Sequence, residues 1–383
     1  MAKHIIYCAD GTWNNPKQDE NEDQSVDPTN VYKLFMCVEG DITAESLLNA
    51  NEQEKALTEN GNTLQVAKYI HGVGDTRNKL VRLLAGAFGA GVISRVVRGY
   101  TFISRNYEPG ANIHIVGFSR GAYTARALAG LIASQGLLAK ALTADKEQAY
   151  RMGAQAWYRY RKTSLSKPSA LAHLAEVVAD LPAFLSQNSL ADKDLVPVDR
   201  IATVAVWDTV GAMGFPEFAA DGRRTDAFRF ADTKLSPKVG TGLHALALDE
   251  QRHDFVPTLW EPADNATQVL FPGAHSDVGG GYPMSDGESG LSDNALQWMM
   301  EGLRKAGLRF GAKPPFPINP DAAGISHKPW THFPFNVPSM LITTRSFPAG
   351  MLRDPSIAKR MAASAVICEP GGNPVRYAPE NLP

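Results

Sequence analysis

Short apolar runs recur along the chain, and each ends in polar or glycine-rich residues. They cover His4 to Ala9, Leu64 to His71, Ile113 to Val116, Ile201 to Trp207 and Val269 to Phe271. Runs of this length, rich in β-branched residues, are typical of strands that are buried on both faces of a sheet. Longer helical patterns separate them, over 30–38, 80–105, 122–132, 146–162, 170–185 and 291–305. This alternation predicts an α/β fold, with a mostly parallel central sheet flanked by helices and connected by right-handed crossovers.

Three segments depart from this alternation. Residues 40–62 are polar, and we expect them to form a surface insertion. Residues 140–198 are expected to form a helical insertion within a single domain spanning 1–383. Two interpretations of that insertion stay open: a cap over an active site, bearing Trp157, Tyr158, Phe184 and Leu185, or helices packed at the edge of the sheet. The tail from Lys313 is rich in proline, which predicts mostly irregular structure.

Composition narrows the class of protein. The chain has 383 residues, of which 44% are hydrophobic and 20% are charged, as is usual for a globular protein. A net charge of -2 gives no support for a nucleic-acid partner. The three cysteines, Cys8, Cys37 and Cys368, have neither metal-ligand spacing nor the even number of a disulfide framework.

The longest apolar stretch and the N-terminal residues indicate where in the cell the protein is expected. The longest apolar stretch, 83–94, is too short to cross a bilayer, so no transmembrane segment is expected. Met1 to Tyr7 leads directly into a strand, without the apolar core or cleavage site of a signal peptide. We therefore expect cytoplasmic synthesis. Secretion by a route that needs no signal peptide stays open.

The strongest chemical signal is Gly117-Phe118-Ser119-Arg120-Gly121, directly after the run Ile113 to Val116. A strand leads into it and a helical pattern follows. This is the context of a nucleophile elbow, in which a strained turn lifts the serine hydroxyl above the sheet. Small residues are needed on both sides because strand and helix approach closely there. The pattern predicts a serine hydrolase with Ser119 as its nucleophile.

A serine hydroxyl needs a base, usually a histidine oriented by a carboxylate. Hydrolases with this elbow place the carboxylate and then the histidine after the serine. Asp208 follows the buried run Ile201 to Trp207, and His275 follows Val269 to Phe271. These two residues complete the predicted triad, although Asp208 could instead start a turn. His253 is the alternative base, and Asp277 is either an alternative orienting carboxylate or a residue that holds the loop.

An oxyanion hole requires two N–H groups aimed at the developing charge. One is expected from Arg120, the residue after the nucleophile. The other is expected from Gly11 or Thr12, in the loop after the first strand, if that strand neighbours the elbow strand. Asp10 could fix this loop, or it could belong to a simple turn. His71 ends a strand and could line the pocket.

Other functional classes receive weaker support. No zinc-protease pattern, cysteine pair, calcium loop or nucleotide-binding glycine loop is present in the sequence. The first hypothesis is therefore a cofactor-independent, metal-free hydrolase of lipid or small esters. A metal-dependent hydrolase that uses Asp10, Asp208 and His275 is a second hypothesis. The third is a non-catalytic hydrolase-like scaffold that binds another protein.

Beside these motifs, the chain resembles a bacterial α/β-hydrolase family long known as a domain of unknown function. Its members include type VI secretion phospholipase effectors. The matching segments are Asp10-Gly11-Thr12-Trp13-Asn14, Gly72-Val73-Gly74, Gly117 to Ala122, Val206 to Gly211, Ala245 to Glu250, Phe271 to Tyr282 and Tyr377 to Pro383. The resemblance implies an α/β-hydrolase fold, the triad Ser119, Asp208 and His275, and cleavage of phospholipid acyl esters. For the scaffold hypothesis, it implies an immunity protein or a secretion component as the partner.

Overall fold

The computed structural model describes residues 2–11, 26–47, 52–71, 88–164, 190–210, 215–218, 224–227, 233–285, 287–333, 335–337 and 341–383. Its main sheet has nine strands in the order β13-β12-β11-β8-β5-β1-β4-β3-β2. The strands of this sheet are β1 His4–Ala9, β2 Asp41–Ile42, β3 Glu52–Glu59, β4 Asn62–Ile70, β5 Asn112–Phe118, β8 Ile201–Trp207, β11 Val239–Ala247, β12 Ala266–Phe271 and β13 Leu352–Arg353. Strands β4 to β13 along this order pair in parallel, whereas β3 is antiparallel to β4 and β2 to β3.

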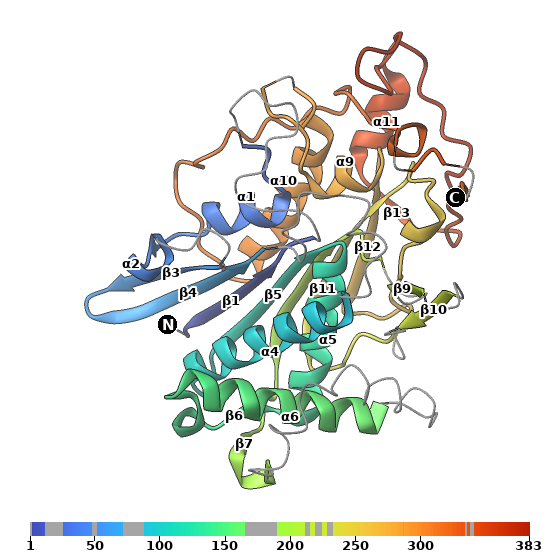
Figure 1. The fold of residues 1–383 in the computed structure, drawn as a ribbon. Coiled ribbons are helices and arrows are strands. Elements are labelled where there is room, and N and C mark those ends of the chain that lie inside the picture. Colours follow the sequence, from blue (N-terminus) through green and yellow to red (C-terminus); the bar gives the residue numbers. More distant parts are fainter. Residues whose placement is uncertain are drawn as a thin grey trace.

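Helices cover both faces of this sheet (Figure 1). The α-helices are α1 Asn30–Cys37, α2 Ala44–Leu47, α4 Phe88–Asn106, α5 Arg120–Gln135, α6 Lys146–Ser164, α9 His275–Gly279, α10 Gly290–Lys305 and α11 Pro355–Ala362. Helices α1 and α10 lie on one face, and α4 and α5 lie on the other (Figure 1). The predicted fold class, a mostly parallel α/β sheet flanked by helices, is confirmed.

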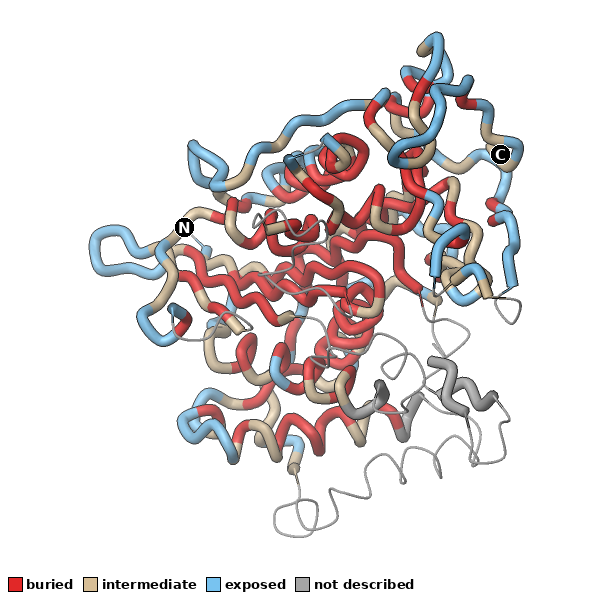
Figure 2. The backbone as a smooth tube through the Cα atoms, turned by 45° about the horizontal axis from the view of Figure 1, so that its top comes forward, coloured by how far each residue is buried: buried red, intermediate tan, exposed pale blue. Residues whose placement is uncertain are grey.

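The alternation of side chains along β1 explains the two layers. Ile5 and Tyr7 belong to the core beneath α4 and α5, whereas Ile6 and Cys8 belong to the core beneath α1 and α10. All four residues are fully buried, and the central strands are buried along most of their length (Figure 2). A strand with both faces covered needs apolar residues at every position, which is why the sequence shows continuous runs.

The polar segment expected to be a surface insertion instead supplies β2, β3 and the start of β4. Its lysine is held by protein groups rather than by solvent, because Lys55 Nζ donates to the Val38 carbonyl at 2.6 Å and to the Met36 carbonyl at 2.9 Å. Glu54 of β3 forms an ion pair with Lys68 of the neighbouring β4 at 3.0 Å. Polar side chains can thus form an antiparallel edge hairpin, whose tip around Asn60 is exposed (Figure 2).

Part of the predicted 140–198 insertion is described. Helix α6 lies outside α4 and α5, on the side away from the sheet (Figure 1). Trp157 is 2% exposed and belongs to the core shared with those helices, as a packed rather than a pocket-lining residue. Phe184 and Leu185 lie outside the described residues, as does the predicted helix 170–185.

Short elements complete the described part of the chain. They are β6 Leu137–Leu138 with β7 Leu195–Val196, β9 Phe215–Phe218 with β10 Arg224–Ala227, and the 3-10 turns Lys140–Thr143, Asp192–Asp194, His253–Phe255 and Pro329–Thr331. The long stretch beyond α10 is mostly irregular, as its prolines predict. None of the described helices is both long enough and apolar enough to cross a membrane.

Candidate active site

Ser119 lies at a strained turn between β5 and α5. Its φ of 57° and ψ of -123° place it in a region that residues other than glycine rarely adopt. Its N–H donates to the Trp207 carbonyl on the adjacent β8 at 3.1 Å, so the sheet ladder reaches the turn. A Cβ at Gly117 would lie 2.3 Å from the Gly121 carbonyl oxygen, and one at Gly121 would lie 2.1 Å from that of Ala9. The two glycines therefore permit the close approach that shapes the elbow.

Asp208 and His275 lie beside this turn and contact one another. Asp208 follows β8, has a φ of 37° and is fully buried. Its Oδ2 lies 2.5 Å from Nδ1 of His275, the first residue of α9. The carboxylate is the acceptor, so Nδ1 carries the proton and a neutral ring presents Nε2 as a base. Among the described residues, Nε2 of His275 has no hydrogen-bond partner.

Arg345, in the irregular tail, binds the same carboxylate and was not anticipated from the sequence. Its Nη1 donates to Asp208 Oδ1 at 2.7 Å and its Nη2 to Oδ2 at 2.9 Å. Burial favours a higher pKa for Asp208, but Arg345 and then His275 outweigh it and hold the pKa well below its usual range. Asp208 is therefore an ionised acceptor. No local motif marks Arg345, which is 137 residues away in the sequence.

Aromatic rings hold the His275 imidazole in place. The Phe118 ring lies 4.6 Å from it between centroids, and the Phe255 ring meets it edge-on at 4.9 Å. Burial lowers the pKa of His275 below its ordinary value, although the hydrogen bond and charge of Asp208 act to raise it. The ring is consequently neutral, as a general base must be, around neutral pH.

A salt-linked corner supports the backbone of His275. Glu250 accepts the His275 N–H at 3.1 Å and binds Arg252 with both oxygens, at 2.9 and 2.7 Å. Burial acts to raise the pKa of Glu250, but Arg252 overcomes this and lowers it to about 2. The Arg252 guanidinium also stacks on Phe255 at 3.6 Å and on Phe335 at 4.5 Å. These contacts fix the ring that packs on His275.

The Asp10 loop lies next to the elbow, because β1 neighbours β5. The buried Asp10 carboxylate accepts hydrogen bonds from Tyr69 at 2.6 Å, from Thr29 at 2.9 Å and from the Gly11 N–H at 2.7 Å. Burial raises the pKa of Asp10 to about 6 despite these donors. Because its N–H is engaged by Asp10, Gly11 is not poised as the expected oxyanion donor in this arrangement. Thr12, the other expected donor, lies outside the described residues.

The remaining predicted residues lie around these groups. Asp277 does not contact His275 through its carboxylate: it accepts the Ala274 N–H at 2.8 Å and pairs with His327 Nδ1 at 2.7 Å, which fits the loop-holding interpretation. His253 begins a 3-10 turn, and the carboxylate of Asp208 binds His275 instead. His71 follows β4 and accepts a hydrogen bond from Arg95 through its carbonyl oxygen.

The carboxylates proposed as metal ligands are occupied by protein donors. Asp10 is bound by hydroxyl and N–H groups, and Asp208 by Arg345, Ala247 N–H and His275. No group of three or more histidine, cysteine, aspartate or glutamate side chains in the described part is arranged to hold a metal ion. The described geometry therefore gives no support to the metal-dependent hypothesis.

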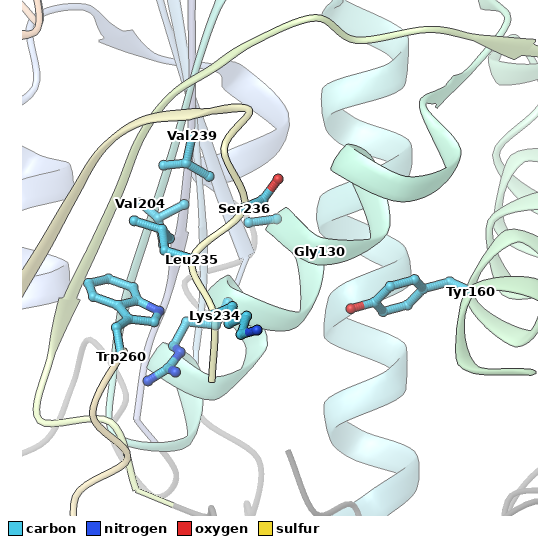
Figure 3. Close-up of a pocket in the computed structure, with 10 residues that line it drawn as sticks. Gly130, Tyr160, Val204, Lys234, Leu235, Ser236, Val239 and Trp260 are labelled. Carbon is cyan, nitrogen blue, oxygen red and sulfur yellow. The ribbon is translucent and has the colours of Figure 1, made fainter. Parts of the chain in front are cut away.

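A small cavity of about 50 Å³ lies elsewhere, between α5, β8 and the segment before β11 (Figure 3). Trp260 and Lys234 lie on one side of it and the Tyr160 hydroxyl lies on the other (Figure 3). None of Ser119, Asp208 and His275 lines it, so it is separate from the candidate active site.

Taken together, the elbow, the carboxylate–histidine pair and the parallel sheet are features of the α/β-hydrolase class. One protein-family model matches residues 3–302. It describes the catalytic domain of Tle1-like phospholipase effectors of the type VI secretion system. The chain belongs to this family, which confirms the resemblance seen in its motifs.

Individual relatives are more distant. The uncharacterized protein YEL023C of Saccharomyces cerevisiae is 27% identical over 276 residues, which cover 68% of this chain and 33% of that protein. A crystal structure of an uncharacterized Pseudomonas aeruginosa protein is 19% identical, with a TM-score of 0.40, and the match covers 81% of this chain and 46% of that one. The Tle1 effector bound to the VgrG spike is 18% identical, with a TM-score of 0.38 and coverages of 74% and 52%. The chain thus spans about a third of the curated relative and about half of each solved chain.

Proposed function

We propose that this chain is a serine carboxyl-ester hydrolase that cleaves acyl esters of phospholipids through an acyl-enzyme. The observation that carries the proposal is the 2.5 Å contact between Asp208 and His275, at strand ends beside the strained Ser119. Membership of a phospholipase effector family supports the choice of substrate.

The proposed mechanism assigns each group a role. His275 Nε2 takes the proton of the Ser119 hydroxyl as the oxygen attacks the acyl carbonyl. Asp208 holds the ring in the tautomer that leaves Nε2 free to accept. The backbone N–H groups of Arg120 and Thr12 stabilise the oxyanion. His275 then protonates the leaving alcohol, and water, deprotonated by the same nitrogen, releases the fatty acid.

The direct test is to treat the purified protein with a fluorophosphonate and measure the mass of the intact chain. One adduct is expected on the wild type and none on Ser119→Ala or His275→Ala. Ser134→Ala, an exposed position on the same helix, is the matched control and should label normally. An unlabelled but folded wild type would contradict the serine mechanism and favour the scaffold hypothesis.

The substrate is tested separately with phospholipid vesicles. Release of fatty acid, rather than of a phosphorylated headgroup, is expected, and it should persist after exhaustive chelation. Loss of activity on chelation would favour the metal-dependent hypothesis. Release of a phosphorylated headgroup would show that a phosphodiester, not an acyl ester, is cleaved.

The family also supports a proposal about context: the chain acts as a secreted effector with an immunity protein or a secretion component as partner. It would be made in the cytoplasm and exported without a signal peptide. Directing the chain to the periplasm of a Gram-negative host should arrest growth, and Ser119→Ala should not. Equal toxicity of the two would argue against an enzymatic effector.

A further inference from the structure

Asp208 lies among other buried charged groups, including Glu250 and Arg345. Each oxygen of the Asp208 carboxylate accepts two hydrogen bonds. Oδ1 accepts from the Ala247 N–H at 3.0 Å and from Arg345 Nη1, and Oδ2 accepts from Arg345 Nη2 and His275 Nδ1. Rotation of the carboxylate would break both hydrogen bonds from the planar guanidinium of Arg345, so Oδ2 stays directed at His275.

Arg345 is itself held by the strands and loops that it joins. Its Nη1 also donates to the Ala247 carbonyl at 2.7 Å, and its Nη2 donates to the Phe255 carbonyl. The carbonyl of Arg345 accepts the Asn381 side-chain amide at 3.1 Å. The residue is 5% exposed, so it is a fixed, dry charge rather than a surface partner.

The charges that face His275 are balanced. Asp208 and Glu250 are the negative groups, and Arg345 and Arg252 are bound to them in two bidentate pairs. The neighbouring His244 is neutral, because burial lowers its pKa to about 3. A proton added to His275 would therefore give this buried cluster a net positive charge, which burial disfavours.

We propose that Arg345 is a positioning residue of the active site, which fixes the carboxylate of Asp208 and, by neutralising it, keeps His275 unprotonated in mildly acidic solution. This inference rests on the proposed serine mechanism. An aspartate without such a partner would attract the imidazolium fully and make His275 easier to protonate. Arg345 opposes that attraction while it preserves the geometry.

The test separates the charge of Arg345 from its shape. The rate of fluorophosphonate labelling is measured against pH in the wild type, in Arg345→Gln and in Arg345→Lys. In the wild type, labelling should fall on the acid side only below the ordinary imidazole value. Arg345→Gln removes the charge, so this fall should begin about one pH unit higher. Arg345→Lys keeps the charge but cannot donate two parallel hydrogen bonds to Asp208. Labelling should therefore slow about tenfold, with no change in the pH at which it falls.

Controls distinguish the possible failures. Arg376→Gln, at an exposed position of the same tail, should leave the profile unchanged. Equal slowing of Arg345→Gln at every pH, without a shift, would show a merely structural role and overturn the proposal. Absence of labelling in the folded wild type would instead overturn the serine mechanism.

A second measurement applies if Arg345→Gln does not fold. The strongly deshielded Nδ1 proton of the Asp208–His275 hydrogen bond can be followed by proton NMR in the folded wild type. The His275 ring is expected to titrate below pH ~6.5, the unperturbed imidazole value. Titration above that value would show that Arg345 does not offset the charge of Asp208, and would overturn the proposal.

Discussion

At the scale of single residues, the candidate site combines backbone strain with charge compensation. Ser119 and Asp208 both have positive φ, at 57° and 37°, and they follow neighbouring strands. Such conformations cost about 1–3 kcal/mol each and persist only where the surrounding structure determines them. Here the hydrogen bonds of the sheet and the guanidinium of Arg345 do so, which places the two candidate site residues at one edge of the sheet.

If Ser119 and His275 act together, loss of either residue should remove most of the activity. Ser119→Ala and His275→Ala should each lower kcat/KM for ester hydrolysis by at least about a thousandfold. The double variant should be little worse than either, because the second residue has no function without the first. Initial rates on a soluble ester measure this. Additive losses would mean that the two residues act independently.

The sequence was informative at some of these residues and silent at others. Asp208 and His275 follow apolar runs, so their meeting could be predicted, because the carboxyl ends of parallel strands lie at the same edge of a sheet. Arg345 could not be predicted, because nothing in its irregular surroundings indicates which buried carboxylate it will reach. The hydrogen bond from the Gly11 N–H to Asp10 could not be predicted either, because it depends on the conformation of the Asp10 side chain.

At the scale of elements, burial decided which strands could be recognised. β5 and β8 are buried on both faces and read as continuous apolar runs. β3 reads as polar because its charged side chains are held in specific contacts: Lys55 donates to the Val38 carbonyl, and Glu54 forms an ion pair with Lys68 of β4. Tertiary contacts override local pattern at such an edge strand. The contact between α5 and β1, by contrast, is set by one small residue, Gly121.

Gly121→Ala tests that contact. Its new Cβ would lie 2.1 Å from the Ala9 carbonyl oxygen and 2.5 Å from that of Asp10, so α5 must move. We expect the free energy of unfolding to fall by about 2–3 kcal/mol, with slower labelling of Ser119. Urea denaturation gives the first quantity. Gly311→Ala is the control, since the new Cβ would come no closer than 3.8 Å to Cys37. Similar losses in both variants would contradict this explanation.

At the scale of the whole molecule, the tail beyond α10 makes buried contacts with the residues of the candidate site and with their neighbours. Arg345 reaches Asp208, Tyr377 donates to Asp249 at 2.9 Å, and His327 lies between two carboxylates. Irregular backbone can be held this way when buried side chains supply hydrogen bonds and ion pairs in place of a regular ladder. The tail therefore contributes to the stability of the loop that carries His275.

The pH dependence of stability should report this connection. Burial acts to lower the pKa of His327, but Asp277 at 2.7 Å and Glu288 at 2.8 Å raise it to about 9. Because the folded value lies above the unfolded value, the stabilisation is complete below about pH 6.5 and is lost as the pH rises through about 9.

The loss should approach about 3 kcal/mol in the free energy of unfolding between about pH 6 and pH 10. Urea denaturation of the wild type and of His327→Gln across this range isolates the effect, since all other titrating groups are shared. The wild type should be the more stable protein at the acid end, and the two curves should converge at the alkaline end. Parallel curves would mean that the carboxylates do not hold His327 protonated, and that the tail is joined to the His275 loop by packing alone.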